Sequence, residues 1–455
     1  MKPPEVWRAI FKSYDVRGTV PDQLDAEAAR AIGLGLANYL GAGPVAVGRD
    51  MRLSSPELAA ALTQGLNDGG VEVWDLGLCS TDMVTFVAGK YGIAGGVMVT
   101  ASHNPPQWNG FKFCERGGYP LSGQHGLDQI LERILTGRLD RAPAPAGVVK
   151  RDLAQEYVRH LLSFIDGDAI GPLKVVVDAG NGMAGKMFPE VARHLPIQVI
   201  PLFFELDGRF PNHLASPIEA ENQEDCKRKI RATGADLGLL FDGDADRVFV
   251  VDEKAAGVSG TVLTALIAER MLRRHPGATI LYNVICGRIV PEVIARDGGR
   301  GVQTPVGHSI IKAIMRKEDA IFAGEHSGHY FFRDNYSADS GLIAALIVLA
   351  LVSRQGRPLS AVIAPYEKYY PSGEINITVA SAAEQQAKIA ALKQRYADGQ
   401  VLTIDGLRVD YPHWWFNVRP SNTEPLLRLN VEADTPERMA EKRDDLLAVL
   451  RSEVG

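Results

Sequence analysis

Three aspartates stand at alternate positions in the stretch LGLLFDGDADRVFVVD. They are Asp242, Asp244 and Asp246, and they come directly after the apolar run Leu237–Phe241. Carboxylates this close together repel one another unless a cation neutralises them. Because ligand sets made only of oxygen select hard ions, the spacing predicts a Mg²⁺ site. The neighbouring Arg247 is suited to orienting a phosphate or tempering a nearby pKa.

Two other interpretations of this stretch exist. The spacing also resembles the start of a calcium EF-hand loop, in which Glu253 would fall at the twelfth position. However, Arg247 occupies the sixth position, where that loop needs glycine, and Val248–Val251 is typical of a strand. A solvated acidic turn is the second alternative. We therefore favour Mg²⁺.

A hydroxyl, an imidazole and an amide follow one another in VMVTASHNPPQWNGFKF, at Ser102, His103 and Asn104. The two prolines that come next exclude a helix and push Asn104 toward an extended conformation. The pattern predicts a strand that ends in a stiff loop holding Ser102. Lys112, two residues beyond a glycine, is placed to carry positive charge toward Ser102.

The stretch NVRPSNTEPLLRLNVE gathers hydrogen-bond donors. A guanidinium fork with hydroxyl and amide groups is suited to clamp a phosphate. Ser-Asn-Thr also describes an ordinary turn or helix cap, so this alternative stays open. The candidate phosphate ligands are Arg419, Ser421, Asn422 and Thr423.

Two histidine-containing stretches offer further polar groups. In AGEHSGHYFFRD, Glu325, Ser327 and His329 alternate on a glycine-flanked segment suited to hydrogen bonding with a polyol. In VGHS, His308 is a candidate acid or base at neutral pH, although a loop histidine is often merely exposed.

Near the N-terminus, KSYDVRG supplies Tyr14 and Arg17, as a phosphate contact or as a surface turn. Taken together, the chain offers a hydroxyl on a rigid loop, a hard-metal site, an acid/base group, a polyol reader and a phosphate clamp. These are the parts needed for phosphoryl transfer to or from a sugar.

The elements that must position these groups alternate along the chain. A short β-branched run, a polar or glycine-containing loop and a helical pattern recur, which indicates mixed α/β layers with sites at strand ends. The strands expected are Val45–Gly48, Val71–Trp74, Val175–Asp178, Leu237–Phe241, Val248–Val251, Thr279–Asn283 and Ile375–Val379, and the helices begin at Ser55 or span Leu342–Val352, Glu384–Tyr396 and Pro436–Arg451.

Composition bounds the class of protein. The chain has 455 residues and a net charge of −6, without a basic tract, which argues against nucleic acid or an anionic membrane as partner. Its four cysteines form no C-x-x-C pair and are expected to be reduced. The apolar run Leu342–Val352 is too short to span a bilayer. Without a signal-peptide pattern at the N-terminus, a cytoplasmic protein is expected.

Changes in composition predict four domains. The Pro/Ala/Gly-rich RAPAPAG at 141–147 indicates a linker after the first, and breaks are expected near 252–260 and 355–374. The predicted domains are 1–147, 148–253, 254–366 and 367–455, with the Ser102 loop, metal loop, sugar-reading segment and phosphate clamp in that order. The last is expected to be a small α+β domain.

The four motifs together resemble those of the α-D-phosphohexomutases. Members of that family carry a T-A-S-H-N-P phosphoserine loop, a D-G-D-x-D-R metal loop, a G-E-x-S-G-H sugar loop and an R-x-S-N-T-E-P phosphate loop. All four occur here in the same order and across nearly the whole chain. The resemblance implies three similar mixed α/β domains and a smaller C-terminal α+β domain around a central cleft.

The resemblance also implies roles. Ser102 would be the phosphorylated serine, and one Mg²⁺ would be held by Asp242, Asp244, Asp246 and a phosphoserine oxygen. Glu325 and Ser327 would contact the sugar hydroxyls O3 and O4, and the clamp at 419–423 would hold the distal phosphate. His308, Lys112 and Arg247 would assist proton transfer. A hexose 1,6-bisphosphate would be activator and intermediate, and the protein would be a monomer or homodimer.

The sugar is less clearly indicated. The Tyr-Phe-Phe-Arg-Asp run at 330–334 is most similar to bacterial phosphomannomutases that feed GDP-mannose synthesis. Ile285 stands where many members carry a lysine, so that contact is missing. The alternatives are a dual or glucose-preferring phosphoglucomutase, a phosphoglucosamine mutase, a phosphoserine-dependent phosphatase, or a sugar-phosphate-binding protein without turnover.

Overall fold

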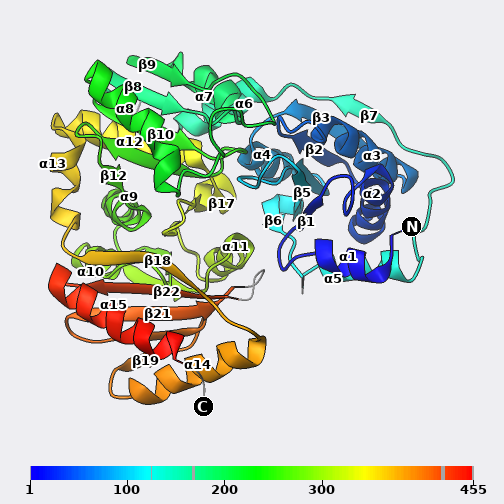
Figure 1. Cartoon of the computed structure of the whole chain (residues 1–455). Coiled ribbons are helices and arrows are strands. Elements are labelled where there is room, and N and C mark those ends of the chain that lie inside the picture. Colours follow the sequence, from blue (N-terminus) through cyan, green and yellow to red (C-terminus); the bar gives the residue numbers. More distant parts are fainter. Residues whose placement is uncertain (1, 124, 166–169, 422–425, 453–455) are drawn as a thin grey trace. The chain divides into compact units, whose positions relative to one another are not determined.

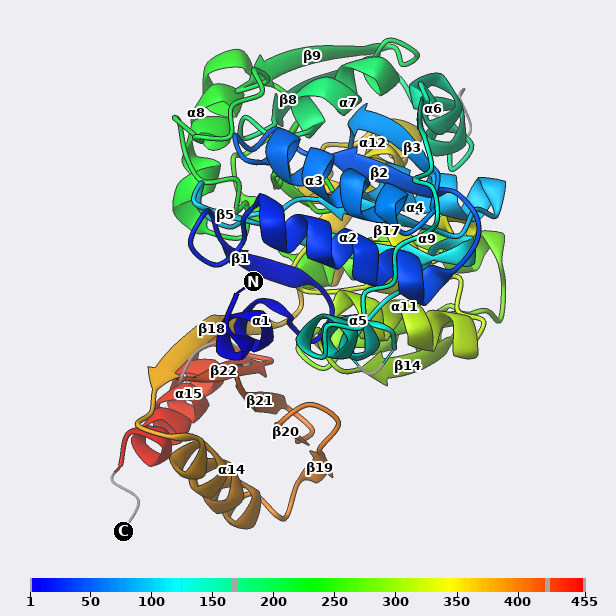
Figure 2. The same cartoon turned by 90° about the vertical axis from the view of Figure 1, so that its right-hand side faces the viewer.

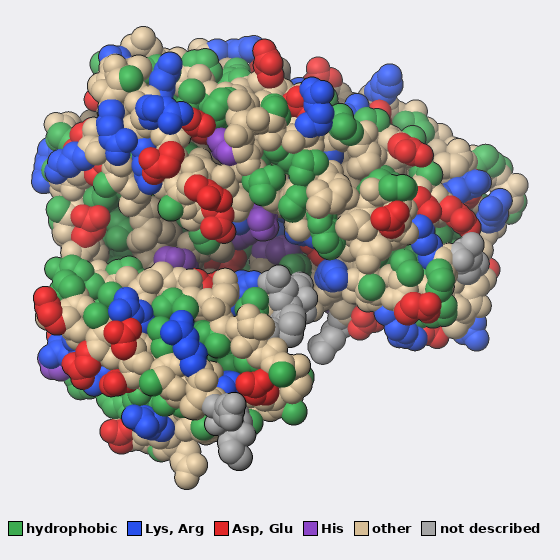
Figure 3. Space-filling model, viewed as in Figure 1, with side chains coloured by type: hydrophobic (Ala, Val, Ile, Leu, Met, Phe, Trp, Pro, Cys, Tyr) green, Lys and Arg blue, Asp and Glu red, His purple; other side chains and the backbone are tan. Residues whose placement is uncertain are grey.

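The computed structural model describes residues 2–123, 125–165, 170–421 and 426–452, and the chain forms two compact units. The first unit contains Met1–Ser259, Gly307–Phe322 and Ser327–Val362, and the second contains Gly260–Val306, Ala323–His326 and Ile363–Gly455. Figure 1 labels the elements of both. Figure 3 shows Lys and Arg side chains interspersed with Asp and Glu on the face in view, without a large area of one sign.

The first sheet of the first unit has strand order β1-β5-β4-β2-β3-β7, with β6 paired to β5. The strands β2, β3, β4 and β7 run parallel, and β5 is antiparallel to β4 and β1. Its elements are α1 Pro4–Ile10, β1 Val16–Thr19, α2 Ala26–Leu40, β2 Val45–Arg49, α3 Ser55–Asp68, β3 Val73–Leu78, α4 Thr81–Tyr91, β4 Gly95–Val99, β5 Trp108–Glu115, β6 Tyr119–Pro120, α5 Leu127–Leu135 and β7 Val148–Lys150.

Side chains of this sheet point alternately to its two faces, and different helices cover each face. Val45 and Val47 of β2 point into the core shared with α2 and α3. On the other face, Gly48 lies so close to α4 that a Cβ there would come 2.7 Å from the Val84 side chain. Figures 1 and 2 show α2 and α3 side by side on one face of the sheet and α4 on the other. The result is a three-layer α/β/α arrangement.

The second sheet of the first unit has strand order β12-β11-β10-β8-β9. Its strand β10 is buried throughout and runs parallel to β8 and antiparallel to β11. The β10–β11 turn is therefore held at a fixed place at the carboxyl end of β10. Its elements are α6 Ala154–Leu162, β8 Leu173–Asp178, α7 Ala184–Ala192, β9 Ile197–Leu202, α8 Glu224–Thr233, β10 Leu237–Phe241, β11 Val248–Asp252 and β12 Gly257–Val258.

The remainder of the first unit comes from later in the chain. It contains α11 His308–Lys317, β16 Tyr330–Phe332, β17 Ala338–Asp339 and α12 Gly341–Gln355. The predicted apolar helix is confirmed as α12, which is buried from Gly341 to Val352. Among the described residues, no single helix has the length and apolar composition to cross a membrane.

The second unit contains a helix-flanked parallel strand pair, β13 with β14, and an antiparallel sheet of order β18-β22-β21-β20-β19. Its elements are α9 Gly260–Arg274, β13 Thr279–Asn283, α10 Ile289–Arg296, β14 Arg300–Thr304, β18 Tyr370–Thr378, α14 Ala382–Arg395, β19 Gln400–Leu402, β20 Leu407–Asp410, β21 Trp414–Pro420, β22 Leu426–Ala433 and α15 Pro436–Arg451. The chain passes between the units at β15 (Phe322–Gly324) and α13 (Leu359–Ile363).

A partly buried ion pair anchors the loop 203–219 to the second sheet. The Nε2 of His213 lies 3.1 Å from Oδ2 of Asp178, at the carboxyl end of β8. Burial lowers the pKa of His213, but the hydrogen bond to Asp178 and its charge outweigh burial, so the pKa is raised above its ordinary value. The protonated imidazole is therefore favoured in the folded protein.

This pair predicts a pH-dependent contribution to stability. Since the folded-state pKa of His213 is raised, its stabilisation is fully present below the unfolded value of about 6.5 and is lost as pH rises through the folded value. We expect His213→Gln to lower Tm more at a pH of about 5.5 than at about 8.5, measured by circular dichroism against the unchanged protein. An equal loss at both pH values would contradict the ion pair.

Candidate active site

The loop after β4 presents the hydroxyl of Ser102. This residue is 3% exposed and has a positive φ of 51°, the left-handed region that non-glycine residues seldom adopt. Its Oγ donates a hydrogen bond to Oδ2 of Asp242 at 2.7 Å and lies 3.2 Å from Nδ1 of His103. Its amide donates to Oγ1 of Thr100 at 2.9 Å. The serine is thus aimed at the aspartate cluster by its own loop.

The three aspartates occupy the turn between β10 and β11, where Phe241 pairs with Val248. All three are buried, and their carboxylate oxygens lie within 4.8 Å of one another. Among the described residues, Oδ1 of Asp244 and Oδ1 of Asp246 have no hydrogen-bond partner although both are buried. Unpaired buried carboxylate oxygens are costly without a cation, so this turn fits a hard divalent ion.

Two cations lie against the aspartates. Nζ of Lys112, on β5, is 2.7 Å from Asp244 and 2.5 Å from Asp246. The Nε of Arg247 donates to Oδ2 of Asp242 at 3.0 Å, and its backbone amide donates to Oδ1. The charge of Lys112, predicted to lie toward Ser102, contacts the aspartate turn that accepts the Ser102 hydrogen bond. Val248 begins a strand, which confirms that this turn is not an EF-hand loop.

The carboxylates differ in their affinity for protons. Burial and the neighbouring charge of Asp246 raise the pKa of Asp242, against the opposing effect of Arg247. Burial would also raise the pKa of Asp244, but the charge and hydrogen bond of Lys112 outweigh it and lower the pKa. Of these two carboxylates, Asp244 therefore holds its negative charge more firmly than Asp242.

Two histidines lie near the aspartates with opposite tendencies. His308, which begins α11, packs edge-on against the Tyr14 ring with centroids 4.8 Å apart. Burial and the charge of Lys312 hold the pKa of His308 well below its ordinary value. Burial also lowers the pKa of His329, but the hydrogen bond to Asp339 and the charge of Asp246 raise it overall. The pair thus provides a neutral imidazole and one that favours protonation.

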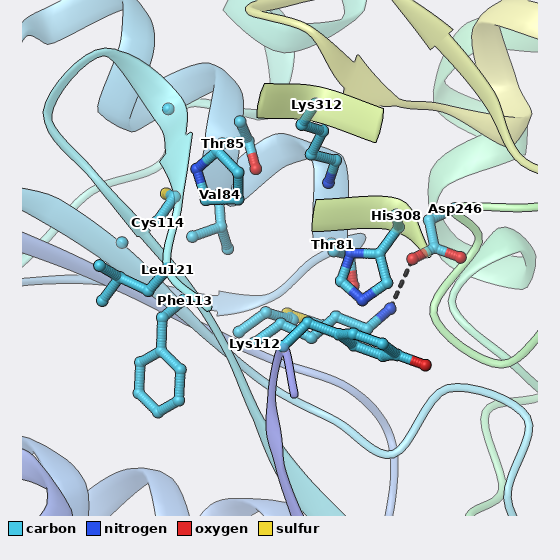
Figure 4. A pocket seen from close by; sticks show the side chains of 15 residues that line it. Thr81, Val84, Thr85, Lys112, Phe113, Cys114, Leu121, Asp246, His308 and Lys312 are labelled. Atoms are coloured by element: carbon cyan, nitrogen blue, oxygen red, sulfur yellow. Dashed lines mark hydrogen bonds and ion pairs between the residues drawn. The ribbon is translucent and has the colours of Figure 1, made fainter. Parts of the chain in front are cut away.

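The tautomer of His329 follows from its partner. Its Nδ1 lies 2.7 Å from Oδ2 of Asp339, whose other oxygen is 2.6 Å from Nζ of Lys312. A carboxylate at Nδ1 fixes the ring orientation and leaves Nε2 available for a substrate oxygen. Figure 4 shows His308, Lys112 and Lys312 gathered beside Asp246.

The N-terminal candidates also reach the serine loop. Arg17, at the edge strand β1, donates from NH1 to Oδ1 of Asn104 at 2.5 Å and from NH2 to Asp15 at 2.6 Å. The Arg17 guanidinium is therefore held by two partners, Asn104 and Asp15, and Asp15 is itself buried. The segment predicted as a phosphate contact or a surface turn thus contacts the loop that carries Ser102.

The remaining candidates belong to the second unit, except Ser327, which belongs to the first. Glu325 is buried, and its Oε1 accepts a hydrogen bond from Nδ2 of Asn283 at 3.0 Å. Arg419, next to the last residue of β21, lies 3.2 Å from Glu374, and Ser421 follows the strand. Asn422 and Thr423 lie outside the described residues.

The segment around Ile285 is held without a lysine. Ile285 is buried, and the carbonyls of Val284 and Cys286 on either side accept hydrogen bonds from NH1 of Arg408 at 2.5 and 3.2 Å. The Arg408 guanidinium in turn stacks on Trp415, 3.8 Å from the ring centroid. The side chain at 285 therefore packs as an apolar residue.

Four contributors to the site were missed from the sequence. Thr81, which begins α4, donates from Oγ1 to Asp244 at 2.5 Å. Lys312 and Asp339 set the two histidines apart, and Arg52 binds the backbone of the serine loop. Thr81 and Arg52 stand 163 and 50 positions from the residues they contact, so no local pattern marks them, whereas Lys312 follows His308 by one turn of α11 and Asp339 is 10 positions from His329.

Comparison with known proteins identifies relatives over the whole chain. Family models described as phosphoglucomutase/phosphomannomutase match four consecutive stretches: alpha/beta/alpha domain I at 8–140, domain II at 155–257, domain III at 259–369 and the C-terminal domain at 374–449. These matches confirm the predicted fold class of three α/β domains followed by a smaller C-terminal domain.

Individual relatives agree. The chain is 38% identical over 452 residues to a phosphomannomutase of Escherichia coli, covering 97% of this chain and 99% of that one. It is 40% identical over 444 residues to a phosphomannomutase/phosphoglucomutase of Pseudomonas aeruginosa, covering 96% and 94%. A solved phosphoglucomutase/phosphomannomutase family protein from Burkholderia thailandensis superposes with a TM-score of 0.90 at 35% identity, covering 99% and 98%.

The aspartate turn predicts tight binding of a divalent cation. Loss of even an outer-shell partner costs a metal site roughly 10- to 100-fold in affinity, so Asp244→Asn should cost at least that much. Isothermal titration with Mg²⁺ measures it. Asp178→Asn is the matched control, because Asp178 is a buried carboxylate that pairs in register with Leu240 of the same sheet. Equal Mg²⁺ affinity in both variants would refute the site.

Proposed function

Because this chain belongs to the phosphoglucomutase/phosphomannomutase family and is an enzyme of the phosphohexomutase type, we propose that it interconverts mannose 1-phosphate and mannose 6-phosphate. The reaction proceeds through a phosphoserine at Ser102 and a hexose 1,6-bisphosphate. The observation that carries this proposal is the buried Ser102 hydroxyl, 2.7 Å from Asp242 in a turn of three aspartates.

Ser102 donates and recovers the phosphoryl group. In the first half-reaction the phosphoserine O–P bond breaks as an O–P bond forms to the free sugar hydroxyl. In the second, the other phosphate of the bisphosphate returns to Oγ of Ser102. The residues that would hold Mg²⁺ are Asp242, Asp244 and Asp246. When bound, the ion withdraws charge from the transferring phosphate.

The two histidines divide the proton transfers. His308 is held neutral by burial and Lys312, so it is suited to accept the proton of the attacking hydroxyl. His329, whose pKa Asp339 raises, is suited to give a proton to the leaving sugar oxygen. Lys112 holds Asp244 charged, Arg247 pairs with Asp242, and the neutral His103 lies beside the serine.

The sugar phosphate is gripped by residues on several segments. Glu325, which Asn283 orients, and Ser327 contact sugar hydroxyls. Arg419, Ser421, Asn422 and Thr423 hold the distal phosphate, and Tyr14, Arg17 and Asn104 bind the substrate beside Ser102. Between half-reactions the bisphosphate must turn end over end, so its contacts must release and re-form.

Dual specificity for mannose and glucose is the second candidate. The Pseudomonas aeruginosa relative carries both activities in its name, whereas the Escherichia coli relative is named for mannose alone. Glucose and mannose share O3 and O4 and differ at O2, and no residue assigned above contacts O2. A phosphoglucosamine mutase or a phosphoserine-dependent phosphatase is a weaker candidate.

The proposal also covers the domains, the pathway, the location and the oligomeric state of the protein. The division into domains 1–147, 148–253, 254–366 and 367–455 assigns one substrate or metal segment to each. Mannose 1-phosphate would supply GDP-mannose synthesis in the cytoplasm, where the four buried free cysteines would stay reduced. The working form is a monomer or homodimer.

The sugar assignment is tested by measuring kcat/KM for mannose 1-phosphate and glucose 1-phosphate side by side. Both assays contain Mg²⁺ and a trace of the matching 1,6-bisphosphate. We expect a clear preference for mannose 1-phosphate. Near-equal values would establish the dual mutase, and steady release of inorganic phosphate would favour the phosphatase.

Ser102→Ala tests the phosphoserine directly. Removing a covalent nucleophile should lower kcat by roughly 10³-fold or more, while the affinity for sugar phosphate measured by titration stays close to that of the unchanged protein. Protein purified in parallel from cells with an empty vector controls for contaminating mutase. Turnover that survives this substitution would exclude Ser102 as the phosphoryl carrier.

A further inference from the structure

One arginine outside the reacting groups binds the backbone of the phosphoserine loop at four points. Arg52 donates from NH2 to the carbonyl oxygens of Ser102 at 2.8 Å and Asn104 at 2.6 Å. It donates from NH1 to those of Pro105 at 2.8 Å and Trp108 at 2.9 Å. Its side chain is 0% exposed, so these bonds form away from water.

We propose that Arg52 is a positioning residue for phosphoryl transfer: its guanidinium fixes the loop 102–108 in the conformation that aims Oγ of Ser102. This inference rests on the proposed function. Arg52 donates to carbonyl oxygens on the loop, and its bonds are not to the serine hydroxyl. Its contribution is therefore geometric.

The backbone of the loop holds it only in part, through the amides of Asn104 and Trp108, which donate to the carbonyl oxygens of Ala101 and Pro105. Ser102 has a positive φ of 51°, an unfavourable region for a residue with a Cβ. Pro105 and Pro106 have no N–H to donate, so the loop cannot close on itself with a regular hydrogen-bond pattern. Only an external donor with several N–H groups can bind carbonyls from four residues at once.

The arginine is itself held from two sides. Its Nε lies 3.3 Å from Oδ2 of Asp50, and its backbone amide donates to Oδ1 of the same carboxylate at 3.0 Å. The Phe210 ring lies 5.1 Å from its guanidinium carbon. A Cβ on Gly208 would come 2.5 Å from the Arg52 Cα, so the 203–219 loop packs tightly on the arginine backbone. The guanidinium of Arg52 is therefore held in one position.

The aspartate turn 242–246 also packs closely against this loop. A Cβ on Gly243 would come 2.4 Å from the Ser102 carbonyl oxygen, the same oxygen that accepts from Arg52. A displaced Ser102 carbonyl would collide with Gly243 or draw Oγ away from Asp242. Lysine cannot replace the arginine here, because its ammonium presents three donors from one point rather than a planar fork.

The test compares Arg52→Lys and Arg52→Met with the unchanged full-length protein. A reacting atom misplaced by about 1 Å costs roughly 100-fold in rate, so we expect kcat for mannose 1-phosphate to fall by about that factor. KM should change by less than about threefold, because Arg52 is assigned no substrate contact. Guanidinium added well below denaturing concentration should restore turnover to Arg52→Ala.

Arg209→Ala is the matched control. Arg209 neighbours Phe210 on the same loop but is 71% exposed and paired with Asp207. This variant should keep normal kcat and show no response to guanidinium. An unchanged kcat in Arg52→Met, or a loss in Arg52→Ala that guanidinium does not restore, would overturn the proposal.

Hydrogen exchange separates this inference from the proposed function. The amides of Asn104 and Trp108 are bonded to Ala101 and Pro105 within the loop, so their exchange reports its order. In Arg52→Lys, which retains charge and most of the side-chain volume, both should exchange faster while α3 stays protected. Unchanged loop exchange overturns the positioning role even if the unchanged protein proves to have no mutase activity.

Discussion

Three carboxylates buried in one turn impose the constraint on which the rest of this structure depends. Asp242, Asp244 and Asp246 repel one another, and burial strengthens that repulsion. Two cations offset this repulsion: Lys112 on β5, and Arg247, the residue immediately before β11. Because Lys112 belongs to the first sheet and the aspartates to the second, charge balance binds the two sheets at the place where the reaction is proposed to occur.

The same electrostatics separate the histidines. His329 shares Asp339 with Lys312, and the hydrogen bond to this carboxylate raises its pKa against the effect of burial. Burial and the charge of Lys312 instead hold the pKa of His308 low, so the two imidazoles have opposite proton preferences. A mutase that runs in both directions needs both states available at the same pH.

Local patterns predicted much of this molecule. The strands Leu237–Phe241 and Thr279–Asn283 and the helix Pro436–Arg451 have the bounds predicted, because buried runs and capping signals are local. The strand expected at Ile375–Val379 instead spans Tyr370–Thr378, since pairing with β22 extends it. The aspartate cluster was predictable for the same local reason. The partner of Lys112 was not, and neither was Arg52, 50 positions before Ser102, because only tertiary contacts define them.

The central claim is that Ser102 carries the phosphoryl group. Its most direct test is mass spectrometry of the peptide containing Ser102 after incubation with glucose 1,6-bisphosphate and Mg²⁺, followed by excess mannose 1-phosphate. We predict that this peptide gains one phosphoryl group in the first step and loses it in the second. A peptide that remains unmodified throughout, while the protein interconverts the sugar phosphates, would contradict the account.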